Sequence, residues 1–181
     1  HFTYAVVTDG DLMEGVSSEA ASLAGHLKLG KLIYLYDDNR ISIDGSTDLA
    51  FTEDRAKRFE AYGWQVLRVA DGNDVPEIDA AITAAKNDPR PSLIICRTHI
   101  GYGLPTRQDT SKAHGEPPGD EELNAAKKNL GWPIEPRFYI PDEVRKFFRQ
   151  AEKTGSGLEK NWNDLLKTYS GQYPELGTEL K

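Results

Sequence analysis

The stretch TDGDLMEG at residues 8–15 follows directly on an apolar, β-rich run at residues 4–7, so Asp9 stands at the end of a predicted strand. A second apolar run at residues 32–36 leads in the same way to Asn39. Because the carboxyl ends of parallel strands meet at one edge of a sheet, these two side chains are expected to lie close together. Carboxylate and amide oxygens are hard ligands for Mg²⁺ or Ca²⁺, and the pattern therefore predicts a cation site there.

Gly10, immediately after Asp9, adds a second feature to this site. A glycine lets a ligand approach the backbone closely, and the N–H groups that open the following helix favour an anion. The combination predicts a magnesium-bound diphosphate. For Asp9 taken alone, the alternative is a side chain that only caps the following helix. Asp9 and Asn39 are both expected outside the core, so that replacing either would cost little stability.

Strand-like and helix-like patterns alternate through the first half of the chain. Strands are predicted at residues 3–8, 32–37, 64–69 and 92–98, and helices at residues 14–28, 52–62 and 74–87. This alternation is typical of an α/β fold, and right-handed crossovers then give a doubly wound parallel sheet with helices on both faces. Ligands of such sheets bind at the carboxyl ends of the strands, where Asp9, Asn39 and the loop after His99 fall.

The rest of the chain is predicted as a long loop followed by helices. Residues 99–118 are polar, with three glycines and three prolines, and a loop of this length is usually functional or disordered. A helix is expected at residues 119–130. Two amphipathic helices are expected in the tail, separated by a break at residues 154–157, with the last ten residues as an exit linker. We therefore predict a partial α/β domain at residues 1–133 and a helical extension at residues 134–181.

Composition argues against several classes of partner. The net charge is −7 without a basic tract, which disfavours nucleic acid because phosphate-backbone binding needs clustered Lys and Arg. No apolar run approaches the roughly 20 residues of a membrane span. The single cysteine, Cys96, lies in an apolar run, so we expect an inert core thiol in a reducing, cytoplasmic compartment. The chain opens at His1, two residues before a predicted strand, and we expect it to be an excerpt of a longer polypeptide.

The sequence around the two strand ends resembles that of transketolases. The longest shared stretch is DLMEGVSSEAASLAGHLKLG at residues 11–30, and shorter ones are ISIDG at residues 41–45, YGW at 62–64, IGYG at 100–103 and HG at 114–115. The paired strand ends alone are common to thiamine diphosphate enzymes and indicate the cofactor, whereas the longer stretches indicate the family. Thr8 departs from the pattern, because the family's motif begins with glycine there, and we expect this change to be tolerated.

The resemblance implies roles for the residues at the strand ends. Asp9, the side chain of Asn39 and the main-chain carbonyl of Ile41 would hold Mg²⁺ or Ca²⁺ against the diphosphate of thiamine diphosphate. Gly10 and Asn39 would also contact the diphosphate directly. These assignments come from the resemblance and agree with the ligand chemistry expected of the strand ends.

Four more residues receive roles from the resemblance, each with a simpler alternative. Ile43 and Ile100 would pack on the cofactor rings, although in most proteins such residues belong to the core. His114 would contact the diphosphate and the sugar substrate, and would otherwise be an ordinary surface histidine. Glu14 would lie at the subunit interface, near the glutamate that activates the cofactor from the other chain, or would only be a first-turn acid that favours the helix dipole. His114 and Glu14 are thus the implied catalytic residues.

The resemblance also implies an enzymatic activity. Transketolases transfer a two-carbon ketol unit from a ketose phosphate to an aldose phosphate in the pentose phosphate pathway, by means of thiamine diphosphate. This chain would be one part of the enzyme, inactive alone, with the remaining domains and a second subunit of a homodimer as partners. The alternatives are a non-catalytic module that binds thiamine diphosphate and metal, a subunit of a split transketolase and, with less support, a protein similar to 1-deoxyxylulose-5-phosphate synthase. A nicotinamide-binding domain is disfavoured because no Gly-x-Gly-x-x-Gly follows the first strand.

Overall fold

The computed structural model describes residues 1–180 of the chain. The chain divides after Trp132 into two compact units, His1–Trp132 and Pro133–Lys181. The first unit contains the strands and all of the candidate site residues, and the second is helical. Within the described part of the chain, no helix is both long and apolar enough to cross a membrane.

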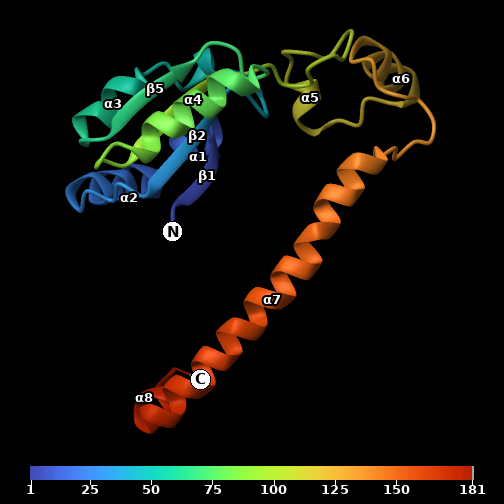
Figure 1. Ribbon diagram of the computed structural model, residues 1–181. Helices are drawn as coiled ribbons and strands as arrows, with labels where there is room; N and C mark the ends of the chain where they lie inside the picture. Colours follow the sequence, from blue (N-terminus) through green and yellow to red (C-terminus); the bar gives the residue numbers. More distant parts are fainter. Residues whose placement is uncertain (181) are drawn as a thin grey trace. The chain divides into compact units, whose positions relative to one another are not determined.

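A four-stranded parallel sheet lies at the centre of the first unit, in the order β1-β2-β6-β5 (Figure 1). The strands are β1 (Thr3–Thr8), β2 (Leu32–Asp38), β5 (Gln65–Val69) and β6 (Ser92–Arg97). In the register of the sheet, Thr8 lies beside Asp37 and Asp38 lies beside Arg97, so three strands end at the same edge. The predicted parallel α/β sheet is therefore confirmed, and Asp9 follows a strand adjacent to the one that precedes Asn39.

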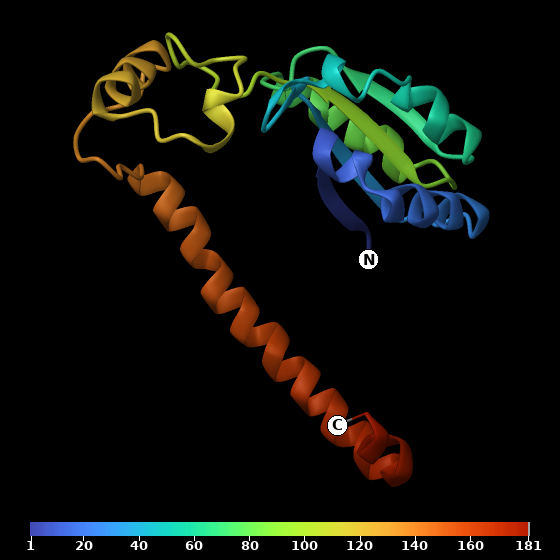
Figure 2. The same cartoon turned by 180° about the vertical axis from the view of Figure 1, so that it is seen from behind.

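Helices cover both faces of the sheet, as predicted (Figures 1 and 2). One face packs against α2 (Gly15–His26) and α3 (Arg55–Ala61), and the other against α4 (Val75–Lys86). On the first face the indole N–H of the buried Trp64 donates to the carbonyl of Ala21 at 2.8 Å, which fixes α2 over the sheet. α3 and α4 pack apolar side chains against the sheet, whereas α2 contributes Ala21 and Ala24 and leaves Val16 and Leu23 exposed.

The first helical segment begins earlier than the predicted range of 14–28. It starts with a short helix, α1 (Asp9–Met13), and α2 follows after a one-residue break. Thr8 caps α1: its Oγ1 accepts from the Asp11 N–H at 3.4 Å, and the Asp11 carboxylate accepts from the Thr8 N–H at 2.8 Å. Threonine therefore has a structural use at the position where the expected motif has glycine.

Short elements that the sequence pattern missed lie next to the carboxyl edge of the sheet. An antiparallel hairpin of β3 (Ile41–Ser42) and β4 (Gly45–Ser46) precedes a turn of 3-10 helix, η1 (Thr47–Leu49). The long polar segment predicted as loop at residues 99–118 contains a one-turn helix, α5 (Lys112–Gly115), and α6 (Asp120–Asn129) follows it. The hairpin carries Ile43 in its turn, and α5 carries His114, so both expected site residues lie on these short elements.

The second unit contains one long helix where two were predicted. α7 (Asp142–Gln172) runs without interruption through the break expected at residues 154–157, so that prediction is wrong. Two glycines cost a helix about 1 kcal/mol each relative to alanine, whereas stopping and restarting would add a second nucleation cost. The Ser156 hydroxyl also donates to the Glu152 carbonyl at 2.8 Å within the helix. The predicted exit linker is likewise wrong, because α8 (Pro174–Glu179) lies there.

Candidate functional site

A cavity of about 890 Å³ lies at the carboxyl ends of β1, β2 and β6. Its wall includes all eight site residues expected from the sequence: Asp9, Gly10, Glu14, Asn39, Ile41, Ile43, Ile100 and His114. The fold therefore brings together residues that are far apart in the sequence. Because a shared wall does not assign a role to each residue, the contacts of each side chain decide what it can do.

Asp9 is only 2 % exposed, which corrects the expectation that it lies outside the core. Its Oδ1 accepts a hydrogen bond from the Tyr36 hydroxyl, whereas Oδ2 is buried without a hydrogen-bond partner among the described residues. Burial raises the pKa of Asp9, and the hydrogen bond from Tyr36 opposes this only in part. Burial and the carboxylate also raise the pKa of Tyr36, so the phenol remains a donor. A nearby cation would favour the charged carboxylate and satisfy its second oxygen.

Asn39, which is 9 % exposed, is held on both sides of its amide. Its Nδ2 donates to Asp37 Oδ2 at 3.1 Å, and its Oδ1 accepts from the Ile41 N–H at 2.8 Å. The Thr98 hydroxyl donates a hydrogen bond to Asp37 Oδ1 and so ties that carboxylate to the residue that follows β6. An amide oxygen has two lone pairs, so Asn39 Oδ1 keeps one for a further contact such as a cation.

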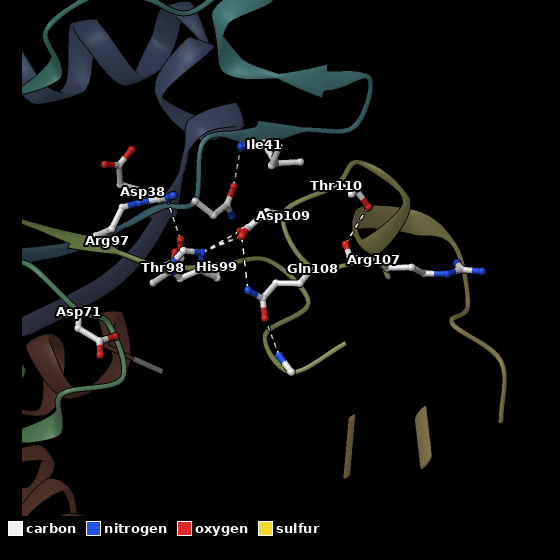
Figure 3. Close-up of polar contacts among 12 residues, drawn as sticks. Asp38, Ile41, Asp71, Arg97, Thr98, His99, Arg107, Gln108, Asp109 and Thr110 are labelled. Atoms are coloured by element: carbon white, nitrogen blue, oxygen red, sulfur yellow. Dashed lines mark hydrogen bonds and ion pairs between the residues drawn. The ribbon is translucent and has the colours of Figure 1, made fainter. Parts of the chain in front are cut away.

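Two arginines fix the strand ends behind the cavity. Arg97 Nη1 donates to the carbonyls of Asp38 and Thr98 at 2.7 Å each, and all three residues lie together in Figure 3. Arg55, on α3, pairs with the Asp38 carboxylate at 3.1 Å. Asp38 is thereby engaged on the α3 side, and the cavity wall is formed by its sequence neighbours on either side.

The other predicted site residues lie on the rim of the cavity. Ile43 lies in the turn of the β3–β4 hairpin and is 67 % exposed, and Ile100 is half-buried at the start of the long loop. Exposed apolar side chains beside polar groups suit the rings of a bound molecule. His114 is exposed on α5. Glu14 is exposed between α1 and α2, and its side chain makes no capping hydrogen bond to α2.

His99 is a wall residue to which the sequence assigned no function. Its Nδ1 lies 2.9 Å from both carboxylate oxygens of Asp109 (Figure 3). The Asp109 N–H donates to the Ile100 carbonyl at 3.0 Å, so the loop that leads to α5 is closed at its base. Asp109 has a φ of 59°, in the left-handed region that side chains other than glycine rarely adopt. The pairing is specific to this loop conformation, and no sequence motif could have indicated it.

The donor set around Asp9 differs from that of an all-protein metal cage. Among the described residues, no three His, Cys, Asp or Glu side chains gather into a metal-binding group. One carboxylate, one amide and a backbone carbonyl would leave coordination positions for oxygens of a ligand, which is how Mg²⁺ is usually bound with phosphates. A Cβ at Gly10 would lie 3.7 Å from Thr8 Oγ1, an ordinary contact. The protein itself therefore does not require glycine there.

Comparison with known proteins identifies the family. A model described as the thiamine diphosphate binding domain of transketolase matches residues 1–181. The chain belongs to this family. The transketolase of Geobacillus stearothermophilus is 51 % identical over 183 residues, and that of Aquifex aeolicus is 50 % identical over 181 residues. Both alignments cover the whole of this transketolase domain and 27 % and 26 % of the two relatives, respectively.

Solved transketolase structures share this fold. A transketolase from Pichia stipitis in complex with sedoheptulose-7-phosphate has a TM-score of 0.84 and 44 % identity, and the match covers 99 % of this chain. Transketolase from Campylobacter jejuni has a TM-score of 0.85 and 40 % identity, with 97 % of this chain covered. The match covers 27 % of the first solved chain and 28 % of the second. The transketolase domain described here thus spans about a quarter of the length of its relatives.

Proposed function

We propose that this chain is the part of a transketolase that holds the diphosphate end of thiamine diphosphate together with Mg²⁺ or Ca²⁺. The observation that carries the proposal is the Asp9 carboxylate, which is buried with one unpartnered oxygen, as far as the described residues show, at a cavity shared with Asn39. The family model is described as a thiamine diphosphate binding domain, and this supports thiamine diphosphate as the cofactor. The chemistry of the donors supports the cation, because hard oxygen ligands suit Mg²⁺ and Ca²⁺.

The residues of the wall fit a cation that is bound to a diphosphate. Asp9 supplies the charge, Asn39 an oriented amide oxygen, and Ile41 a main-chain carbonyl. Burial raises the pKa of Asp9 more than its neighbours lower it, and a cation beside the carboxylate would favour its charged form. Gly10 leaves free space where a side chain would otherwise stand, which lets phosphate oxygens approach the backbone.

The other wall residues orient the bound cofactor and the substrate. Ile43 and Ile100 present apolar surface on which the rings of the cofactor pack. His114, on α5, can donate a ring N–H to a phosphate or to a sugar hydroxyl. Glu14, exposed between α1 and α2, is available to a second subunit.

In the whole protein, we propose transfer of a two-carbon ketol unit from a ketose phosphate to an aldose phosphate. Thiamine diphosphate, when bound, supplies the nucleophilic carbon that this transfer requires. The residues of this chain contribute binding and orientation, while the remaining domains and a second subunit of a homodimer supply the rest of the site. Because the chain spans only 27 % of a typical relative, we propose that it does not turn over by itself.

Calorimetric titration with thiamine diphosphate, in Mg²⁺ and in EDTA, tests the binding proposal. Binding is expected only with Mg²⁺, and Asp9→Ala and Asn39→Ala should each weaken it by about 100-fold or more, since each removes a ligand of the cation. Gly10→Ala should keep the fold but weaken binding, because its Cβ has room in the protein and none beside a phosphate. Asp48→Ala, an exposed acid of η1, is the matched control. Binding that survives EDTA and Asp9→Ala unchanged would contradict the proposal.

The catalytic part has a separate test. Ketol transfer from xylulose 5-phosphate to ribose 5-phosphate should be absent with the 181-residue chain and present with the complete protein. In the complete protein, His114→Ala should lower kcat/KM for the sugars more than it lowers the affinity for the cofactor. Turnover by the chain alone would overturn the division of roles proposed here.

A further inference from the structure

Both candidate ligands of the cation are contacted by residues at the end of one strand, β2. Tyr36 and Asp37 are consecutive in β2, and consecutive side chains of a strand point to opposite faces of the sheet. The Tyr36 hydroxyl donates to Asp9, and Asp37 accepts from Asn39 at 3.1 Å. The strand therefore holds the ligand that follows its neighbour β1 as well as the ligand that follows β2 itself (Figure 1).

Tyr36 is fixed by its surroundings, so its hydroxyl has little freedom. The residue is 0 % exposed and belongs to the core cluster on the α2–α3 face. The guanidinium carbon of Arg55 lies 5.8 Å from the centroid of its ring. The hydroxyl engages Oδ1 of Asp9, and Oδ2 is the carboxylate oxygen that has no partner within residues 1–180. The hydrogen bond therefore selects which oxygen of Asp9 is available to a cation.

Asp37 acts on Asn39 in a comparable way. Its Oδ1 accepts from Thr98 on the neighbouring segment, and its Oδ2 accepts from Asn39 Nδ2. Because the amide nitrogen is held by Asp37, the amide oxygen must point the other way, where it accepts from the Ile41 N–H at 2.8 Å. Without Asp37, only the Ile41 N–H would orient the amide of Asn39, and a rotated amide would present its nitrogen, which cannot bind a cation.

We propose that Tyr36 and Asp37 are positioning residues for the cation: Tyr36 fixes Asp9 so that Oδ2 is free, and Asp37 fixes Asn39 so that Oδ1 faces the same site. The inference rests on the proposed function, because it takes Asp9 and Asn39 as the ligands. Partners that orient metal ligands typically change metal affinity by about 10–100-fold when they are removed. Neither residue has to contact the cation for this effect.

A titration of Mg²⁺ into the complete protein at fixed thiamine diphosphate tests this role by calorimetry. Tyr36→Phe removes only the hydroxyl, and we expect the half-saturating Mg²⁺ concentration to rise about 10–100-fold, with full binding restored at saturating Mg²⁺. Tyr34→Phe is the control, because it removes a hydroxyl from the same strand, from a ring that packs on Trp64. This control should leave the Mg²⁺ dependence within about twofold of wild type.

Asp37→Ala keeps the test decisive if Tyr36→Phe does not fold. It should raise the half-saturating Mg²⁺ concentration by a similar factor, because the amide of Asn39 loses the partner that orients it. Asp44→Ala removes a negative charge from the same cavity wall and should have a smaller effect. Equal effects of Asp37→Ala and Asp44→Ala would mean that charge alone acts, and would overturn the positioning role of Asp37.

The outcomes separate this inference from the proposed function. A folded Tyr36→Phe protein with the Mg²⁺ dependence of wild type would overturn the role of Tyr36. A lower melting temperature of Tyr36→Phe in EDTA, together with an unchanged Mg²⁺ dependence, would also overturn this role, since Tyr36 would then stabilise the fold without orienting Asp9. If the wild-type protein bound thiamine diphosphate without any dependence on Mg²⁺ or on Asp9, the proposed function itself would fail.

Discussion

Asp9→Asn is expected to have opposite effects on stability in the absence and in the presence of the cation. The substitution keeps the shape of the side chain and its ability to accept from Tyr36, and it removes the charge. The carboxylate is 2 % exposed, and its Oδ2 has no hydrogen-bond partner in the described part of the chain. The metal-free protein therefore carries a buried charge that it compensates only in part, and the variant does not.

The size of both effects follows from this burial. An unsatisfied buried polar group costs about 1–3 kcal/mol, and a charged one costs more, so exchanging the charge for an amide should gain about 1–2 kcal/mol. For a chain of 181 residues, this raises the melting temperature by roughly 2–8 °C. Cation and cofactor at about 100 times Kd should stabilise the wild type by ~2.7 kcal/mol and leave the variant unchanged. The order of the two stabilities should then reverse.

The stability difference should also depend on pH in a definite direction. The pKa of Asp9 in the folded protein is raised above its ordinary value of 3.8, chiefly by burial. The cost of the charge is therefore fully present at a pH above the folded pKa, and it is lost as the pH falls through that pKa toward 3.8. In EDTA, the advantage of Asp9→Asn should be largest at neutral pH and should shrink in acid.

Thermal unfolding in EDTA and in Mg²⁺ with thiamine diphosphate measures these quantities directly. Asp48→Asn, an exposed acid of η1, controls for a general change of charge. A lower melting temperature of Asp9→Asn in EDTA would refute the claim that the buried carboxylate is poorly compensated. A cation-induced rise equal to that of wild type would refute the assignment of Asp9 as a ligand.

Three further predictions concern single residues within one or the other unit. Gly25→Ala should lower the free energy of unfolding in urea by about 1–3 kcal/mol, because its Cβ would lie 1.8 Å from the Tyr62 carbonyl oxygen. Gly15→Ala is the control in the same helix: its Cβ meets nothing within 4 Å, and the free energy of unfolding should rise by up to about 1 kcal/mol. Cys96 is 6 % exposed, and burial raises the pKa of its thiol. The thiol should therefore react with a thiol reagent only as fast as the protein unfolds locally, and rapid labelling of the folded protein would contradict this. Gly155→Ala should slow amide exchange in the middle of α7 about fivefold, and unchanged exchange would mean that the glycine does not weaken the helix.

Much of the fold could be predicted from the sequence because its signals are strong and local. The central strands β2 and β6 are apolar runs followed by polar residues, and α3 and α4 pack apolar side chains on the sheet, whereas α2 buries only alanines there. The hairpin at residues 41–46 was missed because strands of two residues are too short to show a period. The single helix α7 was missed for the opposite reason: local glycine signals suggested a break, but two weak positions do not end a helix of 31 residues.

The candidate site divides in the same way between what a sequence can and cannot indicate. Asp9 and Asn39 stand out because they are polar and follow apolar runs, and strand-end logic then places them together. The sequence did not indicate Tyr36, because a tyrosine within an apolar run is expected to be a core residue. The role proposed for it depends on the parallel register of the neighbouring strands β1 and β2, which brings its hydroxyl to Asp9 at the end of β1. A contact of that kind requires the three-dimensional structure.

The burial of Asp9 connects the stability of the domain to its function. Burial raises the pKa of Asp9, so a carboxylate at this position is expected to destabilise the protein when no cation is bound, while an exposed carboxylate would bind a cation more weakly because water screens its charge. The hydrogen bond from Tyr36 lowers part of the cost and also fixes the geometry, since it occupies one oxygen and leaves the other. A cation that binds this oxygen contributes to folding as well as to cofactor binding, so the two equilibria are linked. If the proposed function is right, the domain should accordingly be most stable when a cation and a diphosphate are bound at Asp9.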